Sequence, residues 1–251
     1  MSTKTLKKRP LKKRTLSPAE DLELASALSF PEPDFIIGLD EVGRGCLAGP
    51  VFAGGFIYAV KESQIIAANV SEVRVIDSKI LDADERLASE SVLQKISEGR
   101  QCSVQPASVA EIDAINIHHA SLLAMSRCFD ELVSRFELGV RHKLLILVDG
   151  SFVPKQILSR PEVQSQQWKA ASLTKGDGRS FAIAAAAIVS KEARDRLMRQ
   201  LASLHPAYHW ERNVGYPTPD HRIALTKLGD TSWHRKSFKW QPMEESAAAE
   251  V

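Results

Sequence analysis

Two adjacent carboxylates, Asp40 and Glu41, follow directly after an apolar run that begins at Phe35. The run predicts a buried strand, and a carboxylate in apolar surroundings is costly unless it is paired or bound to a metal. An ordinary hairpin with solvated charges is the alternative for any single acidic pair at a strand end. Acids delivered by a buried strand therefore indicate a site that binds a metal ion or a reacting group.

The loop that follows carries two glycines around one arginine, Gly43-Arg44-Gly45. Glycines let backbone N–H and C=O groups approach a ligand because no Cβ stands in the way. Arg44 is suited to contact a phosphate or a sugar. The loop leads into a second apolar run, 51–60, which predicts a strand, a tight loop and a strand. A dinucleotide-binding loop is excluded by the glycine spacing and by the absence of a following helix.

A third aspartate, Asp149, follows the apolar run 144–148. Such a run is typical of a strand that is covered on both faces. If this strand lies parallel to and beside the first one, Asp40 and Asp149 meet at the edge where α/β sheets carry their sites. Taken alone, Asp149 is explained equally well as a turn residue.

Two later aspartates are candidates for a fourth carboxylate. Asp177 lies in the loop 174–180, just ahead of a helix predicted over 180–204. On its own it is explained as an N-terminal cap of that helix. Asp195 lies two or more turns inside the helix and has arginines beside it. We expect Asp177 to be the fourth carboxylate, with Asp195 as the second candidate.

As a unit, Asp40-Glu41-Val42-Gly43-Arg44-Gly45 resembles the signature of the type 2 ribonucleases H, the ribonuclease HII family, in its bacterial form. Other segments resemble the same family in the same order: Asp77-Ser78-Lys79, Val148-Asp149-Gly150, Lys175-Gly176-Asp177 and Gly215-Tyr216-Pro217-Thr218. The resemblance covers about 34–240. It leaves out the N-terminal arm, the connection 152–167 and the C-terminal tail.

The residues alone predict the α/β class, with a mixed sheet that gathers carboxylates at one edge. The resemblance implies a ribonuclease H-like fold: a central mixed five-stranded sheet flanked by helices, plus a helical C-terminal region. It also implies an endonuclease that hydrolyses the RNA strand of RNA–DNA hybrids and nicks 5′ of single ribonucleotides embedded in duplex DNA, as ribonucleotide excision repair requires. Its partners are then RNA–DNA hybrids and DNA duplexes containing ribonucleotides, and we expect a monomer.

The resemblance also assigns the site. It implies catalytic carboxylates that hold two Mg²⁺ or Mn²⁺ ions about 4 Å apart: Asp40, Glu41, Asp149 and Asp177. It implies substrate contacts from Gly43, Arg44, Gly45, Ser78, Lys79, Lys191 and Tyr216. The glycine loop would read the 2′-hydroxyl, and Tyr216 would favour deoxyribose as the next sugar. Consecutive side chains on a strand point to opposite faces, so Asp40 and Glu41 share a metal site only if the strand twists or ends between them.

Two other functions are compatible with part of this pattern. Another nuclease or transposase of the same fold would also use clustered carboxylates, but would not need the glycine loop or the motif 215–218. A non-catalytic protein that binds RNA–DNA hybrids would be expected to lack at least one of the acids, and none is missing. His118 and His119 are not a chelating pair, because adjacent helix positions point about 100° apart.

The composition is that of an ordinary globule, with 44% hydrophobic and 25% charged residues and a net charge of +2. Three widely spaced cysteines form neither a disulfide framework nor a zinc motif, so we expect a reducing, cytoplasmic setting. No apolar run is long enough to span a membrane. We expect four parts: a basic, disordered arm and linker (1–33), the catalytic domain (34–204), a nucleic-acid-contacting region (205–240) and a disordered tail (241–251).

Periodicity and caps give the remaining elements. Helices are predicted after Ser17 and over 82–97, 110–136 and 180–204, with further strands over 102–106 and 168–173. The connection 152–167 is predicted to be a loop. Segment 205–240 holds three of the four tryptophans and six Lys or Arg against three acids. This composition suits either a nucleic-acid surface or a small aromatic core.

Overall fold

The computed structural model describes residues 14–244, and five strands at its centre form one mixed sheet in the order β3-β2-β1-β4-β5. The strands are β1 (Phe35–Val42), β2 (Val51–Ala59), β3 (Cys102–Ala107), β4 (Leu144–Asp149) and β5 (Trp168–Leu173). β1, β2 and β3 pair antiparallel, whereas β4 is parallel to both β1 and β5. The predicted mixed five-stranded sheet is confirmed.

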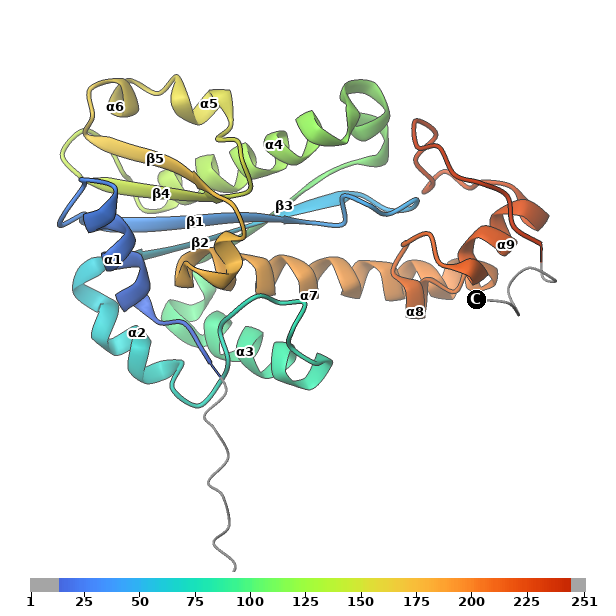
Figure 1. The fold of residues 1–251 in the computed structure, drawn as a ribbon, viewed down its shortest axis with the longest axis horizontal. Helices are drawn as coiled ribbons and strands as arrows, with labels where there is room; N and C mark the ends of the chain where they lie inside the picture. Colours follow the sequence, from blue (N-terminus) through green and yellow to red (C-terminus); the bar gives the residue numbers. More distant parts are fainter. Residues whose placement is uncertain (1–13, 245–251) are drawn as a thin grey trace, which may run out of the picture.

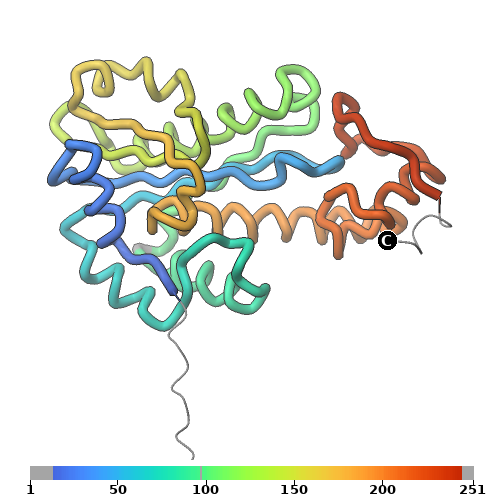
Figure 2. The backbone as a smooth tube through the Cα atoms, viewed as in Figure 1, coloured from blue at the N-terminus to red at the C-terminus, as the bar shows by residue number. Residues whose placement is uncertain are grey.

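Two long helices cover the sheet, α4 on one face and α7 on the other (Figure 1). The helices are α1 (Pro18–Ala27), α2 (Ser63–Asn69), α3 (Ala83–Lys95), α4 (Val109–Arg135), α5 (Lys155–Leu158), α6 (Pro161–Gln164), α7 (Phe181–Leu204), α8 (Trp210–Asn213) and α9 (Pro219–Leu228). α7 runs beyond the sheet, and the C-terminal region lies at its far end, beside the β1–β2 loop (Figure 2). Across residues 14–244, no helix is both long and apolar enough to cross a membrane.

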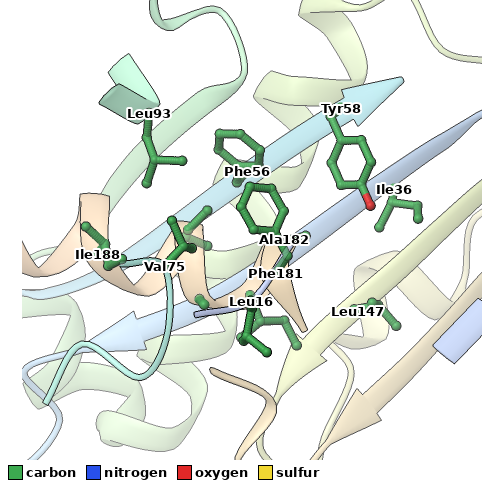
Figure 3. Packing of buried hydrophobic residues seen from close by; sticks show 14 of the residues in the cluster. Leu16, Ile36, Phe56, Tyr58, Val75, Leu93, Leu147, Phe181, Ala182 and Ile188 are labelled. Carbon is green, nitrogen blue, oxygen red and sulfur yellow. The ribbon is translucent and has the colours of Figure 1, made fainter. Parts of the chain in front are cut away.

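α7 lies close to the sheet because both surfaces are built from small residues. A Cβ added to Gly38 on β1 would lie 2.1 Å from the carbonyl carbon of Ala182, and one on Gly54 of β2 would lie 2.1 Å from the carbonyl oxygen of Ala186. Glycine is therefore required at both strand positions. Larger side chains fill the space at the start of the helix, where the rings of Phe56 and Phe181 meet edge to face (Figure 3).

Segment 14–33 is packed onto the domain, although the sequence suggests an arm and linker. The predicted cap is confirmed, since Ser17 and Glu20 form a capping box at the start of α1. Leu16 is fully buried, and its N–H donates to the carbonyl of Val75. The expected disorder of 1–13 and of most of the tail lies outside the described residues.

Two local features differ from the prediction. The connection 152–167 is not all loop, because it holds the one-turn helices α5 and α6. The helix predicted over 110–136 is interrupted at Asn116, whose φ of 64° and ψ of 164° are not helical. The Asn116 side chain accepts from the N–H groups of His118 and His119, so it caps the second half of α4. Asparagine tolerates this backbone better than most residues, because its side chain satisfies the exposed N–H groups.

Candidate active site

The carboxyl ends of β1 and β4 meet at one edge of the sheet, as their sequences predict. The two strands are parallel neighbours, with Leu39 opposite Val148. Asp40 and Asp149 are the next residues on the two strands. Both carboxylates therefore lie at the same edge, at matching positions.

Side chains on β1 alternate between the two faces of the sheet. Gly38 faces α7 and Leu39 packs under α4. The alternation places Asp40 on the α7 face and Glu41 on the α4 face. β1 runs past both residues to Val42, so the strand does not end between them. The Glu41 side chain can reach the other carboxylates only by passing around the end of the paired strands, beyond the last β1 residue that pairs with β4.

Asp149 and Asp177 complete the group on the α7 face. Leu147, two positions before Asp149, belongs to the cluster packed against α7. Asp177 lies in a 3₁₀ turn, Gly176–Gly178, directly before that helix. One oxygen of Asp149 accepts from the N–H of Gly176 at 2.6 Å, which ties the turn to the end of β4.

Burial and mutual repulsion perturb these carboxylates. Burial, together with the charges of Glu41, Asp149 and Asp177, raises the pKa of Asp40 well above its usual value. Burial and the charges of Asp77 and Asp149 likewise raise the pKa of Asp177. The pKa of Glu41 is raised by burial, against the opposing effect of Arg44. A nearby cation would therefore favour the ionised form of these carboxylates.

Basic side chains and one backbone N–H already partner some of these carboxylates. Arg44 lies 3.1 Å from Glu41, and the Lys79 ammonium lies 3.8 Å from Asp177. Partial burial lowers the pKa of Lys79, but the charges of Asp177 and Asp40 outweigh it and raise that pKa overall. Asp77 lies close enough to Asp177 for its charge to act on that carboxyl. Asp77 is a site residue that the sequence prediction did not include, although the motif that contains it was recognised.

The donor set fits a divalent cation in its chemistry. Mg²⁺ and Mn²⁺ prefer carboxylate oxygens, and the four predicted ligands, Asp40, Glu41, Asp149 and Asp177, are all carboxylates. They do not form a closed cage: among the described residues, no three His, Cys, Asp or Glu side chains converge as metal ligands. Glu41 and Asp177 instead turn toward Arg44 and Lys79.

Asp195, the second candidate for the fourth carboxylate, lies elsewhere. It is buried in α7 about four turns beyond Asp177, and the ammonium of Lys191 lies 2.5 Å from it. Its charge acts on Tyr216, in the C-terminal region. This arrangement favours Asp177 as the fourth carboxylate. It also engages Lys191, a predicted substrate contact, in an internal ion pair.

A buried arginine of the C-terminal region contacts the Gly43–Gly45 loop from the interior of the protein. Arg235 is 3% exposed, and its guanidinium donates to the carbonyls of Gly43 and Arg44 at 2.7 and 2.9 Å. It donates a third bond to the carbonyl of Gly49 at 2.9 Å. Burial lowers the pKa of Arg235 to about 10, which leaves the group charged at neutral pH.

A second buried arginine, Arg194 of α7, lies against the same loop. It donates to the carbonyls of Ala48, Pro50 and Val214 at 3.1, 3.1 and 2.8 Å. Gly43 has a φ of +86°, and a Cβ there would lie 2.1 Å from the Arg194 Nε. The sequence prediction missed the roles of Arg194 and Arg235, because nothing in a charged residue's local pattern indicates complete burial.

Tyr216, a predicted substrate contact, lies beside this loop. A Cβ on Gly45 would lie 3.9 Å from the ring of Tyr216, which is 38% exposed. Burial and the neighbouring Cys46 raise the pKa of its hydroxyl. Tyr216 therefore presents part of its ring beside the glycine loop. Of the other predicted substrate contacts, Ser78 is buried and Lys79 is exposed.

The remaining aromatic residues of the C-terminal region form a small core. Trp210 is fully buried, and its indole N–H donates to His221 Nε2 at 3.1 Å. His221 Nε2 also lies 3.1 Å from His234 Nε2, and the N–H of Thr231 donates to His234 Nδ1 at 2.9 Å. These partners require His234 to carry its proton on Nε2 and both imidazoles to be neutral. Trp210 thus packs this region internally.

Comparison with known proteins gives one consistent family. Residues 37–241 match the family model described as Ribonuclease HII. The Ribonuclease HII of Ruegeria pomeroyi is 44% identical over 219 residues, which cover 87% of this chain and 82% of that protein. The Ribonuclease HII of Thermosynechococcus vestitus is 40% identical over 203 residues, covering 81% and 83%.

Solved structures show the same fold at lower identity. The ribonuclease H2 of Pyrococcus horikoshii aligns with a TM-score of 0.58 at 24% identity, covering 82% of this chain and 94% of that chain. The RNase HII of Archaeoglobus fulgidus, solved as a complex with PCNA, aligns with a TM-score of 0.59 at 21% identity, covering 85% and 99%.

Proposed function

Since this chain belongs to the ribonuclease HII family, whose members are divalent-metal-dependent endonucleases acting on RNA–DNA hybrids, we propose that it nicks duplex DNA 5′ of single embedded ribonucleotides. One observation carries the proposal. The carboxylates lie where β1 and β4 end, the Gly43–Gly45 loop follows β1 directly, and the partly exposed ring of Tyr216 lies against that loop.

The carboxylates are proposed to hold the metal ions. Asp40, Glu41, Asp149 and Asp177 would bind Mg²⁺ or Mn²⁺, two ions during catalysis, once Glu41 and Asp177 turn away from their basic neighbours. When bound, such ions activate water and neutralise charge on the phosphorus and on the leaving oxygen. The Bst RNase HIII, which shares the fold, was solved in complex with Mn²⁺. The raised pKa values of Asp40, Glu41 and Asp177 support this assignment, because a bound cation would offset the burial and the neighbouring negative charges that raise them.

The glycine loop is proposed to recognise the ribose. Arg235 engages the carbonyls of Gly43 and Arg44 from inside the protein. The N–H groups of the loop and the 48% exposed guanidinium of Arg44 are then left to face a bound sugar. An N–H group contacts the oxygen of a 2′-hydroxyl and has no partner on a deoxyribose, so the loop favours a ribonucleotide.

The residues around these groups are proposed to bind the duplex. Tyr216 would pack on the deoxyribose next to the ribonucleotide, and Lys79 would contact a phosphate with its exposed ammonium. Ser78 and Lys191 are proposed to support the same strand. The catalytic domain 34–204 and the region 205–240 would thus contact different parts of one substrate, and a monomer suffices for this.

We also propose a reducing, cytoplasmic setting. The three cysteines are free and buried. Burial raises the thiol pKa of Cys46, and raises those of Cys102 and Cys128 to about 12. Buried, protonated thiols of this kind are typical of proteins that never form disulfides.

Cleavage mapping tests the proposed reaction. The protein would be incubated with Mg²⁺ or Mn²⁺ and one of three labelled substrates: a DNA duplex with one ribonucleotide, an all-DNA duplex, or a long RNA–DNA hybrid. We expect a nick 5′ of the ribonucleotide, no cut in the all-DNA duplex, and loss of cleavage in Asp149→Asn. Binding without cleavage in either metal would contradict the proposal and favour a non-catalytic hybrid-binding protein.

A further inference from the structure

The segment just ahead of the family-matched residues contacts the start of α7 through a buried carboxylate. Asp21 on α1 is fully buried, and one of its oxygens accepts from the Ser180 hydroxyl at 2.6 Å. The other accepts from the N–H of Ala182 at 3.0 Å and from the Tyr58 hydroxyl at 3.1 Å. Ser180 is the cap residue of α7, and it follows Asp177 by three positions. Asp21 therefore fixes the point where the Asp177 turn joins α7.

The same segment also holds the chain that leads to Lys79. The N–H of Leu16 donates to the carbonyl of Val75 at 2.7 Å, and the N–H of Val75 donates to the Thr15 hydroxyl at 2.9 Å. Leu16 and Val75 belong to one buried cluster with Phe181, the first residue of α7 (Figure 3). Arg14 completes the contact by donating to the carbonyl of Gly178 at 3.3 Å.

Two irregular stretches of backbone thus meet at Asp177 and share one support. Neither the 75–79 stretch nor the 174–180 loop is part of a strand, so sheet pairing does not fix their positions. Their side chains nevertheless interact, since the Lys79 ammonium lies 3.8 Å from Asp177 and the charge of Asp77 acts on the same carboxyl. A short segment that is bonded to both can set their separation.

We propose that the segment Arg14–Asp21 is a brace that positions Asp177 and Lys79, with Asp21 as a positioning residue at the start of α7. The inference rests on the function proposed above for the same site. Asp21 does not touch the substrate in this account. It acts through Ser180 and Ala182, and Thr15 and Leu16 act through Val75.

The chemistry of Asp21 supports a positioning role over simple filling of the core. Burial raises its pKa to about 6, so an ionised carboxylate at this place is costly. The start of α7 partly offsets that cost, because helix N-termini favour negative charge. An apolar residue would fill the space but leave three donors without partners: the Tyr58 hydroxyl, the Ser180 hydroxyl and the N–H of Ala182.

Three variants and one control separate the brace from general stability. Asp21→Ala removes the link to α7, whereas Asp21→Asn keeps an oxygen that accepts from the N–H of Ala182 and offers an NH₂ group that can donate to the Ser180 hydroxyl oxygen, the reverse of the native bond. Thr15→Val removes only the hydroxyl that Val75 uses. Val133→Ala, in the cluster under α4, destabilises the opposite face of the sheet and leaves both stretches untouched.

Each variant would be compared in kcat and KM on the single-ribonucleotide duplex, in melting temperature, and in hydrogen exchange. We expect Asp21→Ala to lower kcat at least tenfold with little change in KM, and to speed exchange of the Gly176 amide that bonds Asp149. Asp21→Asn should restore most of both. Thr15→Val should raise KM severalfold and speed exchange over 75–79. Val133→Ala should lower the melting temperature with kcat unchanged.

Two outcomes would overturn the brace. The first is an Asp21→Ala protein that melts earlier but keeps its kcat and its Gly176 exchange rate. The second is equal loss of kcat in Val133→Ala at the same melting temperature. If Asp21→Ala does not fold, unchanged KM and unchanged exchange over 75–79 in Thr15→Val would overturn it. Failure of the wild-type protein to cut would instead contradict the proposed function, and the exchange rates would still report on the brace.

Discussion

The carboxylates of the sheet edge are carried by regular structure, whereas the Gly43–Gly45 loop is held by side chains that come from far along the chain. Asp40 and Asp149 follow from the pairing of two parallel strands. The loop depends on Arg235, almost two hundred residues away, and on Arg194 from the far part of α7. One region is built by backbone pairing between strands and the other by hydrogen bonds from charged side chains.

We therefore expect metal binding and sugar recognition to depend on separate parts of the site. Strand pairing places acids at fixed spacings, which suits metal ions that need only oxygen ligands. Recognition of a sugar needs a particular backbone shape, and the buried arginines impose that shape from below. We therefore expect cleavage and sugar selection to be separable by substitution.

The largest effect is expected at the carboxylates. Asp40→Asn removes one proposed carboxylate ligand at the sheet edge and leaves a neutral amide in its place, so metal affinity and cleavage should fall together. A loss of several kcal/mol in transition-state stabilisation corresponds to a rate decrease on the order of 10³-fold or more. Single-turnover cleavage and metal titration by calorimetry would measure both. Binding of the duplex should persist, and loss of duplex binding with intact metal affinity would contradict the division.

Arg235→Gln should break the loop while the carboxylates remain intact. The carbonyls of Gly43, Arg44 and Gly49 would lose a charged donor, and the free energy of unfolding should fall by roughly 1–3 kcal/mol. We expect kcat/KM to fall by roughly 10- to 100-fold on both ribonucleotide-containing substrates, with metal affinity unchanged. Urea unfolding would measure the free energy of unfolding, cleavage kinetics would measure kcat/KM, and calorimetry would measure metal affinity.

Lys236→Gln is the matched control for Arg235→Gln. It removes the same charge from the neighbouring, exposed position, without any bond to the glycine loop. We expect near wild-type stability and cleavage. If both variants lose the same activity, the effect of Arg235 is one of net charge and not of loop shape.

The histidine pair should make the C-terminal region sensitive to acid. Burial, with the charge of His221, lowers the pKa of His234 to about 4, below the usual 6.5. The unfolded chain then binds the proton more readily, so stability is complete above pH 6.5 and declines as the pH falls from 6.5 toward 4. His234→Gln should flatten this part of the curve of unfolding free energy against pH.

The comparison with wild type isolates His234 from an opposing group. Asp21, whose pKa is raised to about 6, stabilises the fold in the opposite direction, as the pH falls from 6 toward 4. It is present in both proteins and cancels in their difference. An unchanged slope in His234→Gln would show that this imidazole does not titrate in that window.

The smallest effect is expected at Lys79. Its ammonium is exposed, and removing one phosphate contact lowers the slope of log K against log salt by about 0.9. Lys79→Gln should show this change in duplex-binding titrations at several salt concentrations. Lys61→Gln, near the opposite edge of the sheet, should leave the slope unchanged; an equal change in both would assign the effect to net charge.

The sequence predicts the parts of the molecule that local patterns control. Apolar runs ending in aspartate predict β1, β4 and their shared edge, and Ser17 predicts the start of α1 from its capping pattern. In each case, a few neighbouring residues determine the outcome.

Long-range contacts account for what the sequence prediction missed. Arg194 and Arg235 have the local appearance of surface residues, and only the fold shows that their donors meet backbone carbonyls. In the sequence, Asp21 has the pattern of an ordinary helix residue, and only the packing of α7 against α1 shows its buried hydrogen bonds. The interruption at Asn116 depends on one side chain competing for backbone N–H groups, which helical periodicity does not reveal.

The division between cleavage and selection is tested most directly with Tyr216→Ala. Its kcat/KM would be measured on the single-ribonucleotide duplex and on the long RNA–DNA hybrid in the same metal. Loss of ring packing on a deoxyribose predicts a decrease of roughly tenfold or more on the first substrate and little change on the second. Equal decreases on both substrates, or a loss of metal affinity, would contradict the account.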